Sequence, residues 1–135
     1  MSLTDPTSQN QCTVTRDEDG NAIGKITGVN RKLINRLKRG EIPPRRSLDL
    51  HGLTQKEAHR DVRAFLRQSR LDGENCVLII TGKGINSPVG AGVLKEAVPH
   101  WISQSPNVNH ILGFCPALPA HGGSGALYVL LRKFP

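Results

Sequence analysis

Strand-like and helix-like segments alternate from Ser47 onward, and this alternation most limits how the 135-residue chain can fold. The run 47–51 alternates apolar and polar residues, which is typical of a strand. Thr54 and Glu57 then form a capping-box pattern, which predicts a helix over about 55–70. A strand followed directly by a helix is the first half of a βαβ unit.

The second half of the pattern begins at residues 76–80, which are apolar at every position, as in a strand buried on both faces. An apolar stripe at helical spacing predicts a second helix over about 92–104, with a kink or ragged boundary at Pro99. Strands are expected at about 108–115 and 125–132. The pattern βαβαββ predicts an α/β fold, a two-layer sandwich with a four-stranded mixed sheet.

This topology brings three distant turns together. A strand–helix–strand connection normally makes its two strands parallel, so the first three strands should end at one edge of the sheet. Ligands of open α/β sheets usually bind at that edge. The turns that follow these strands carry His51, Lys83 and His121.

The region before the first strand divides in two. Residues 1–28 are polar and lack a lasting apolar period, so we predict a flexible N-terminal segment. Residues 29–46 should hold a short basic helix over 30–39 and a stiff linker. The remaining 47–133 would form the globular domain.

Positive charge is concentrated in that basic segment. The chain has a formal net charge of +7, and residues 31–46 hold seven basic side chains against Glu41 alone. A basic block beside a globular domain is the electrostatic footprint of a nucleic-acid binder, and a solvated helix face is the alternative. The predicted nucleic-acid contacts are Arg31, Lys32, Arg36, Lys38, Arg39, Arg45 and Arg46.

Cysteines and apolar runs bear on the compartment. The three cysteines are widely spaced and lack a CxxC pair, which gives little support to a zinc site. An odd cysteine count without a signal peptide fits a reducing compartment, and no apolar run approaches the roughly 20 residues that span a bilayer. We therefore predict a cytoplasmic protein with no membrane partner.

The strand end Leu48–Gly52 holds the first candidate for chemistry. Period-two alternation places Asp49 and His51 on one face, where a carboxylate can orient an imidazole for proton transfer. The alternative is structural: Asp49 would bond backbone groups of a neighbouring loop, and His51 would cap the following helix.

Two glycine-rich turns hold the other candidates. Thr81–Gly84 is not a Walker loop, but glycines around Lys83 let the backbone approach a phosphate. His121 precedes a second such turn and is a candidate for proton transfer or phosphate contact. The predicted phosphate-binding residues are Lys83, Gly82, Gly84, Gly122, Gly123 and Gly125. The alternative for the first turn is a tight turn with a solvated lysine, and the alternative for the second is a hairpin connection whose glycines supply positive φ.

These three motifs, in this order and spacing, resemble those of the Smr (small MutS-related) domain, over about residues 47–133. The resemblance implies a fold similar to the C-terminal domain of the bacterial third translation initiation factor. It also implies a nucleic-acid-binding endonuclease. Some members are associated with nicking DNA, and others with cutting mRNA on stalled ribosomes, which makes the ribosome a candidate partner.

The available side chains favour RNA as the substrate. RNA carries its own nucleophile, so cleavage needs only a base, an acid and a cation, which His51, His121 and Lys83 can supply. DNA cleavage by water commonly uses metal ions held by several carboxylates, and the predicted edge offers only Asp49. We therefore predict RNA cleavage with no metal or cofactor. A DNA-nicking enzyme and a non-catalytic nucleic-acid-binding or ribosome-binding module remain alternatives.

Overall fold

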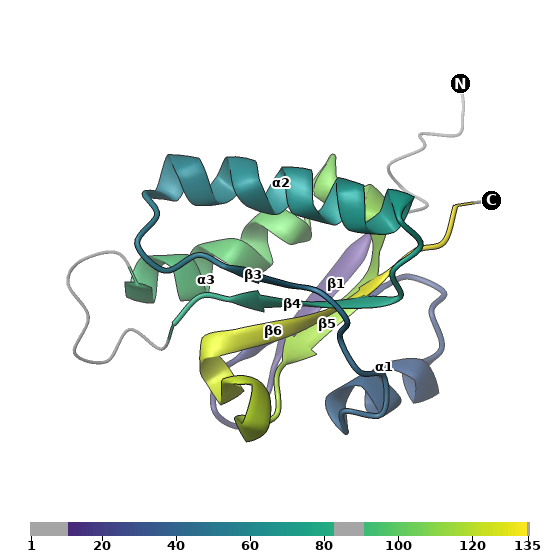
Figure 1. Cartoon of the computed structure of the whole chain (residues 1–135). Coiled ribbons are helices and arrows are strands. Elements are labelled where there is room, and N and C mark those ends of the chain that lie inside the picture. The colour runs from purple at the N-terminus through teal and green to yellow at the C-terminus, as the bar shows by residue number, and fades with distance from the viewer. Residues whose placement is uncertain (1–10, 83–90, 135) are drawn as a thin grey trace.

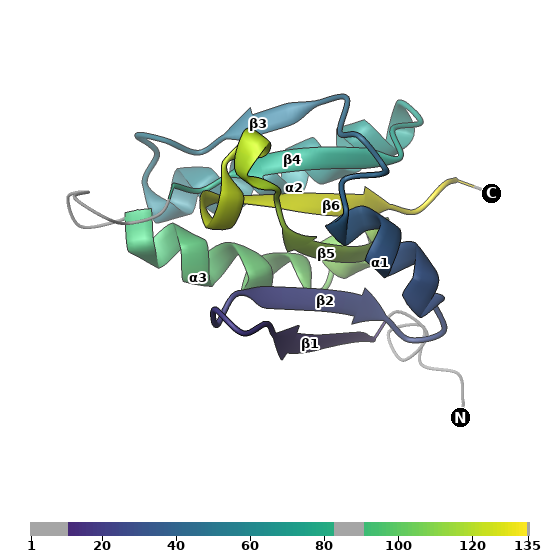
Figure 2. The ribbon, with the colours of Figure 1, turned by 90° about the horizontal axis from the view of Figure 1, so that it is seen from below.

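The computed structural model describes residues 11–82 and 91–134, which build a mixed sheet covered by helices on both faces (Figure 1). The six strands lie in the order β1-β2-β5-β6-β4-β3, which can be followed from below in Figure 2. The strands are β1 (Cys12–Arg16), β2 (Ala22–Ile26), β3 (Ser47–Asp49), β4 (Cys76–Ile80), β5 (Ile111–Pro116) and β6 (Ala126–Leu131).

The sheet has two strands more than the four predicted, because residues 12–26 form the hairpin β1–β2 and not a flexible segment. The carboxylate of Asp17 accepts the backbone N–H groups of Asp19 and Asn21 and so fixes the turn. The inward-facing positions of β2 include Ala22 and Gly24, and these small residues hide the period-two pattern of hydropathy. Strand β2 then pairs with β5 and extends the sheet.

The helices follow the predicted signals. Helix α1 (Arg31–Lys38) begins after Asn30, whose side chain accepts the N–H of Lys32. Helix α2 (Gln55–Leu71) begins at the predicted capping box of Thr54 and Glu57, and α3 (Ala91–Ile102) continues through Pro99. Within the described ranges, no helix has both the length and the apolar character needed to cross a bilayer.

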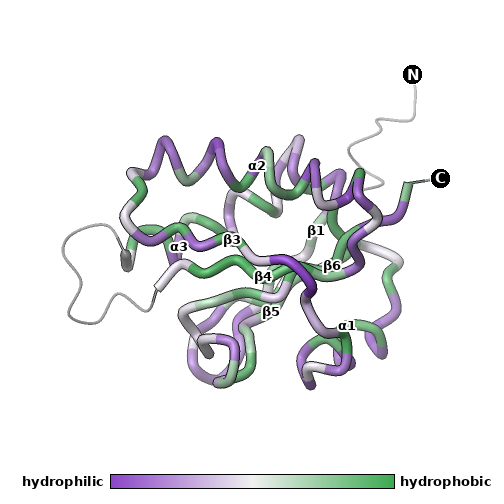
Figure 3. The backbone as a smooth tube through the Cα atoms, in the orientation of Figure 1, coloured by the Kyte–Doolittle hydropathy of each residue, from purple (hydrophilic) through white to green (hydrophobic). Residues whose placement is uncertain are grey.

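Apolar side chains fill both faces of the sheet. Helices α2 and α3 cover one face, and their helix-side core includes Leu50, Val62 and Ile79. Helix α1 lies on the other face, where the α1-side core includes Leu37 and Tyr128. Figure 3 shows β4 as a hydrophobic stretch between these layers, as its uniformly apolar sequence predicts.

The direction of the strands confirms the predicted common edge. Strand β3 is parallel to β4, and both β4 and β5 are antiparallel to β6, which lies between them. Strands β3, β4 and β5 therefore all end at the edge of the sheet where β6 begins.

The opposite edge of the sheet holds a half-buried arginine with several partners. Arg70, near the end of α2, donates to the backbone oxygen of Asn109 at 3.0 Å and lies 3.2 Å from Nδ1 of His110. Its guanidinium also lies over the Phe134 ring at 4.1 Å, which ties the C-terminal segment to α2. Burial, together with the charges of Arg70 and Arg67, lowers the pKa of His110 from its ordinary value.

This lowered pKa predicts a loss of stability on mild acidification. The unfolded chain binds a proton at His110 more readily than the folded chain, so the stabilising contribution is complete above the ordinary histidine pKa of about 6.5. This stabilising contribution is lost as the pH falls through the lower pKa that His110 has in the folded state. Glutamine at position 110 can still accept from Arg70 but does not titrate, so His110→Gln should lose less stability than the wild type between neutral and mildly acidic pH.

Urea unfolding at the two pH values measures this difference. The exposed His100→Gln is the matched control, and it should keep the acid sensitivity of the wild type. Equal acid sensitivity in His110→Gln and the wild type would contradict the role assigned to His110.

Candidate active site

The register of the sheet brings two of the motif turns to one edge. Asp49 of β3 is paired with Ile80 of β4, and Ile80 in turn is paired with Ala126 of β6. Beyond β4, the N–H groups of Thr81 and Gly82 both donate to the carbonyl oxygen of Gly125, at 2.9 and 3.0 Å. The turns after β3 and before β6 therefore flank the end of β4, as the topology predicted. Lys83 and Gly84 lie outside the described residues.

Asp49 and the turn that carries His121 lie on the α1 side of this edge. Ser47 and Asp49 are exposed, whereas Leu48 and Leu50 between and after them pack in the helix-side core. The alternation of β3 therefore turns the Asp49 carboxylate away from α2 and α3. In Figure 2 the short turns of residues 119–125 lie on the same face of the sheet as α1.

The Asp49 carboxylate bonds backbone and not an imidazole. Its Oδ1 accepts the backbone N–H of His51 at 2.9 Å, and no hydrogen bond joins it to the His51 ring. The N–H of Leu53 donates to the carbonyl of Leu50, and Gly52 has φ +81, which closes a tight turn around His51. The predicted orientation of the ring by Asp49 is therefore wrong in this structure. Asp49 instead fixes the turn that holds His51.

The His51 side chain is exposed at the tip of that turn. Among residues 11–82 and 91–134 the His51 ring has no hydrogen-bond partner, and only the backbone N–H of this exposed residue is bonded. Both ring nitrogens are therefore available to a ligand. The alternative of His51 as a helix cap does not hold, because Thr54 caps α2.

A buried tyrosine orients His121. Nδ1 of His121 lies 2.6 Å from the hydroxyl of Tyr128, and that hydroxyl also accepts the N–H of Leu118 at 3.2 Å. The tyrosine is fully buried on β6 and packs edge-on against the imidazole, with ring centroids 5.5 Å apart. A hydroxyl can donate to a neutral imidazole and accept from an imidazolium, so Tyr128 can hold His121 in both protonation states.

Sequence reasoning missed Tyr128. The available signal is that a tyrosine inside a strand, with apolar neighbours on both sides, needs a partner for its hydroxyl. The partner itself cannot be read from the sequence, because it depends on how the turn 119–125 folds back over β6.

The glycines of the second turn make internal bonds. The N–H groups of Gly122, Gly123 and Gly125 donate to the carbonyl oxygens of Pro119, Leu118 and Gly122. The N–H of Gly82 is likewise occupied by Gly125. These four amides therefore do not form a cradle of free donors. The left-handed conformation of Gly122 (φ +114) serves the fold of the turn that presents His121.

A small hollow lies between His121 and the segment that leads into β3. Its volume is about 250 Å³, and its lining includes Arg45, Ser47, Leu78 and His121. Arg45 has no ion pair among the described residues, so its charge is available to an anion near the imidazole.

Acidic neighbours already occupy part of the predicted basic surface. Arg39 lies 2.6 Å from Glu41, and Arg36 shares the same carboxylate at 3.6 Å. The hydrogen bond from Arg39 lowers the pKa of Glu41. Arg46 bonds Asp72 at 2.8 Å and lies 3.4 Å from Glu74. Arg36, Arg39 and Arg46 are therefore less available for phosphates than the sequence predicted.

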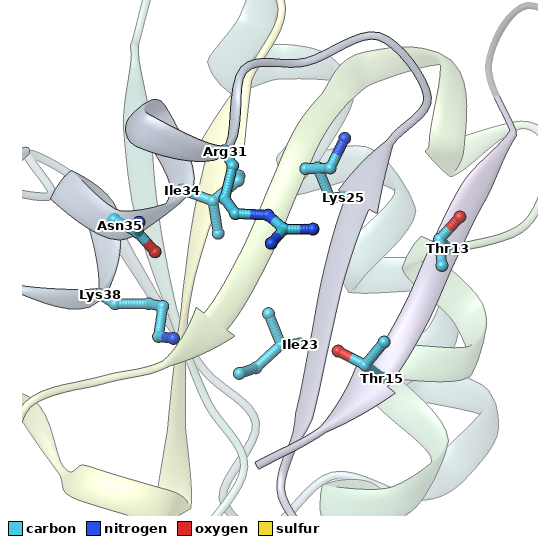
Figure 4. Close-up of a pocket in the computed structure, with 8 residues that line it drawn as sticks. All are labelled: Thr13, Thr15, Ile23, Lys25, Arg31, Ile34, Asn35 and Lys38. Atoms are coloured by element: carbon cyan, nitrogen blue, oxygen red, sulfur yellow. The ribbon is translucent and has the colours of Figure 1, made fainter.

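Two cations of α1 that make no ion pair within residues 11–82 and 91–134 line a separate groove. Arg31 and Lys38 line a groove of about 320 Å³ between α1 and the hairpin β1–β2 (Figure 4). The ammonium of Lys25 points away from its centre and donates to the carbonyl of Val29 at 2.9 Å. Lys32 is exposed on α1. The predicted basic block is thus spread over more than one surface.

Potential metal ligands are scattered in the part of the chain that the structure describes. No three histidine, cysteine, aspartate or glutamate side chains gather there closely enough to hold a metal ion. The three cysteines are free, and burial raises the pKa of Cys76 and Cys115 to about 12. Neither buried thiol is an accessible nucleophile.

Comparison with known sequences and structures places this arrangement in a family. The model of the Smr domain matches residues 48–132, from the start of the β3 motif through β6. The chain belongs to the Smr domain family. Its Smr domain therefore contains the two described motif turns, and the hairpin β1–β2 and α1 precede it.

Two curated relatives carry different descriptions. The chain is 37% identical over 106 residues to the "Probable DNA endonuclease SmrA" of Escherichia coli, covering 78% of this chain and 55% of that protein. It is 35% identical over 105 residues to the "Ribosome rescue factor SmrB" of Photobacterium profundum, covering 78% and 54%. The chain spans about half the length of the curated relatives it matches.

Two solved structures share the fold. YdaL, a stand-alone small MutS-related protein from Escherichia coli, matches with a TM-score of 0.67 and 33% identity over 91% of this chain and 85% of YdaL. The Smr domain of Thermus thermophilus MutS2 matches with a TM-score of 0.56 and 30% identity, over 65% of this chain and 99% of that domain.

Proposed function

We propose that this Smr protein is an endonuclease that cuts RNA without a metal ion, through proton transfer by His51 and His121. The observation that carries the proposal is the sheet register, which brings the turns of both histidines to one edge. Each imidazole has at least one ring nitrogen free among the described residues, and imidazole exchanges protons near neutral pH.

The reaction uses the nucleophile that RNA supplies. One histidine takes the proton of the 2′-hydroxyl as its oxygen attacks the adjacent phosphorus, and the other gives a proton to the departing 5′-oxygen. The products are a 2′,3′-cyclic phosphate and a 5′-hydroxyl. Arg45 in the hollow beside His121 stabilises the negative charge that develops on the phosphate. The sequence adds Lys83 to this role, and Asp49 keeps the His51 turn in place.

A substrate with a single ribose among deoxyriboses tests the nucleophile. Cleavage should occur only at the ribose and should continue in EDTA, because the 2′-hydroxyl is present there alone and no metal takes part. An all-deoxy strand of the same sequence is the control. Equal cutting of the control strand, or complete inhibition by EDTA, would contradict the proposal.

DNA nicking is the second candidate, and it is favoured by the relative described as a probable DNA endonuclease. Water must then attack the phosphorus, which commonly requires metal ions held by carboxylates. The relatives described as ribosome rescue factors favour RNA on or near the ribosome as the substrate. The single-ribose experiment separates the two.

A further inference from the structure

Helix α2 carries a stripe of cations that the candidate site does not use. The stripe consists of Lys56, Arg60, Arg63 and Arg67, which are all exposed. Their spacing of four, three and four residues places them on one face of the helix. Their buried counterparts, including Ala58, Val62 and Leu66, occupy the opposite face in the helix-side core. In Figure 3 the outer turns of α2 are mostly hydrophilic.

Carboxylates leave most of this charge uncompensated. Arg60 makes one long ion pair, at 3.8 Å with Asp61, and its side chain is 71% exposed. Such exposed pairs contribute little. Lys56, Arg63 and Arg67 have no ion pair with any carboxylate that the structure describes. A row of unpaired like charges is unfavourable by itself, so the stripe is suited to an anionic ligand.

The stripe begins in the first turn of α2, which follows the His51 turn closely in the chain. Lys56 is five residues after His51 and lies in the first turn of α2. From there the cations extend along the helix toward the opposite edge of the sheet over about 16 Å, at one residue per about 1.5 Å. Helix α2 lies on the outside of the molecule, on the face opposite α1 (Figure 1).

We propose that the α2 stripe binds the phosphate backbone of a nucleic-acid strand that continues from the candidate site onto the helix face. This inference rests on the proposed function, which sets where the strand lies. It requires the substrate to extend far enough on one side of the cleaved bond to reach the cations of α2. Three of the four cations are arginines, whose planar fork matches phosphate oxygens. A membrane surface fits poorly, because the apolar face of α2 is already buried in the core.

The salt dependence of binding tests the stripe directly. The triple variant Arg60→Gln, Arg63→Gln, Arg67→Gln removes three cations from exposed helix positions with a residue that favours helix. The control Arg16→Gln, Lys95→Gln, Lys133→Gln removes the same charge elsewhere. The ligands are 2′-O-methyl RNA strands of about 30 and about 6 nucleotides. The first is longer than common single-strand site sizes and the second is near their lower end, and neither can be cut through a 2′-hydroxyl.

Each phosphate contact of a single strand contributes about 0.7 to the slope of log binding constant against log salt concentration. For the long strand, loss of three contacts should therefore make this slope shallower by about 2 in the stripe variant. The control should keep the wild-type slope. The short strand should bind the stripe variant and the control alike, because it does not reach along α2. Replacement of the three arginines by lysine should restore the slope, since lysine also neutralises phosphate charge.

Equal slopes for the stripe variant and its control would overturn the inference, and so would an equal loss with the short strand. Loss of binding to anionic vesicles, with strand binding unchanged, would assign the stripe to a membrane and also overturn it. Absence of cleavage by the wild type would contradict the proposed function alone, because the slope is measured on strands that are not cut.

Discussion

Replacement of His51 by alanine is expected to lower the rate of RNA cleavage by about a hundredfold to ten-thousandfold, the usual contribution of a proton-transfer group. The ring is exposed and has no hydrogen-bond partner in the described part of the chain. The turn is held by the Asp49 carboxylate, Gly52 and the Leu50 carbonyl. The variant should therefore fold like the wild type. A gel assay on the single-ribose substrate measures the rate, and circular dichroism checks the fold.

The exposed His100 on α3 provides the matched control. His100→Ala removes an exposed imidazole from α3, outside the three motifs. This variant should cleave at the wild-type rate. If His51→Ala is folded and cleaves as fast as His100→Ala, His51 takes no part in the chemistry.

The second large effect is expected at His121. His121→Ala should lower the rate by about a hundredfold or more, because it removes the other proton-transfer group. Loss of the ring also frees the Tyr128 hydroxyl, which keeps its bond from the Leu118 N–H, so the turn should persist. The measurement is the pH dependence of kcat/KM. The wild type should give a bell-shaped profile, and each histidine variant should lose one limb.

Tyr128→Phe separates chemistry from positioning. Tyr128 does not reach the substrate in this account, and its hydroxyl orients Nδ1 of His121. Its loss should lower the rate by about tenfold to a hundredfold through misplacement of the ring, and it should shift the limb that belongs to His121. A merely structural role would reduce stability and leave the positions of both limbs unchanged. An unshifted bell-shaped profile in His121→Ala would contradict the assignment of His121 itself.

The local signals in the sequence predicted most of the central fold. Thr54 and Glu57 placed the start of α2 because a capping box depends only on neighbouring residues. Residues 76–80 predicted a strand covered on both faces because every position is apolar, and every position of β4 is buried or nearly so. The common edge followed from the strand–helix–strand connections, which normally make their strands parallel, and the strand directions confirm it.

Features that depend on small residues or on folded loops were not predictable in the same way. The hairpin β1–β2 was missed because Ala22 and Gly24 give no hydropathy alternation. The bond of Asp49 to backbone, and that of His121 to Tyr128, depend on the path of each turn. The stripe on α2 was missed because the net charge of the whole domain hides five cations on one helix.

The chemical ends of the cleavage products distinguish attack by the 2′-hydroxyl from attack by water. We expect the single-ribose substrate, cut in the presence of EDTA, to yield one fragment ending in a 2′,3′-cyclic phosphate and one beginning with a 5′-hydroxyl. Mass spectrometry distinguishes these ends without further treatment. Fragments that carry a 3′-hydroxyl and a 5′-phosphate would show that water attacked the phosphorus, and they would contradict proton transfer to and from the RNA by His51 and His121.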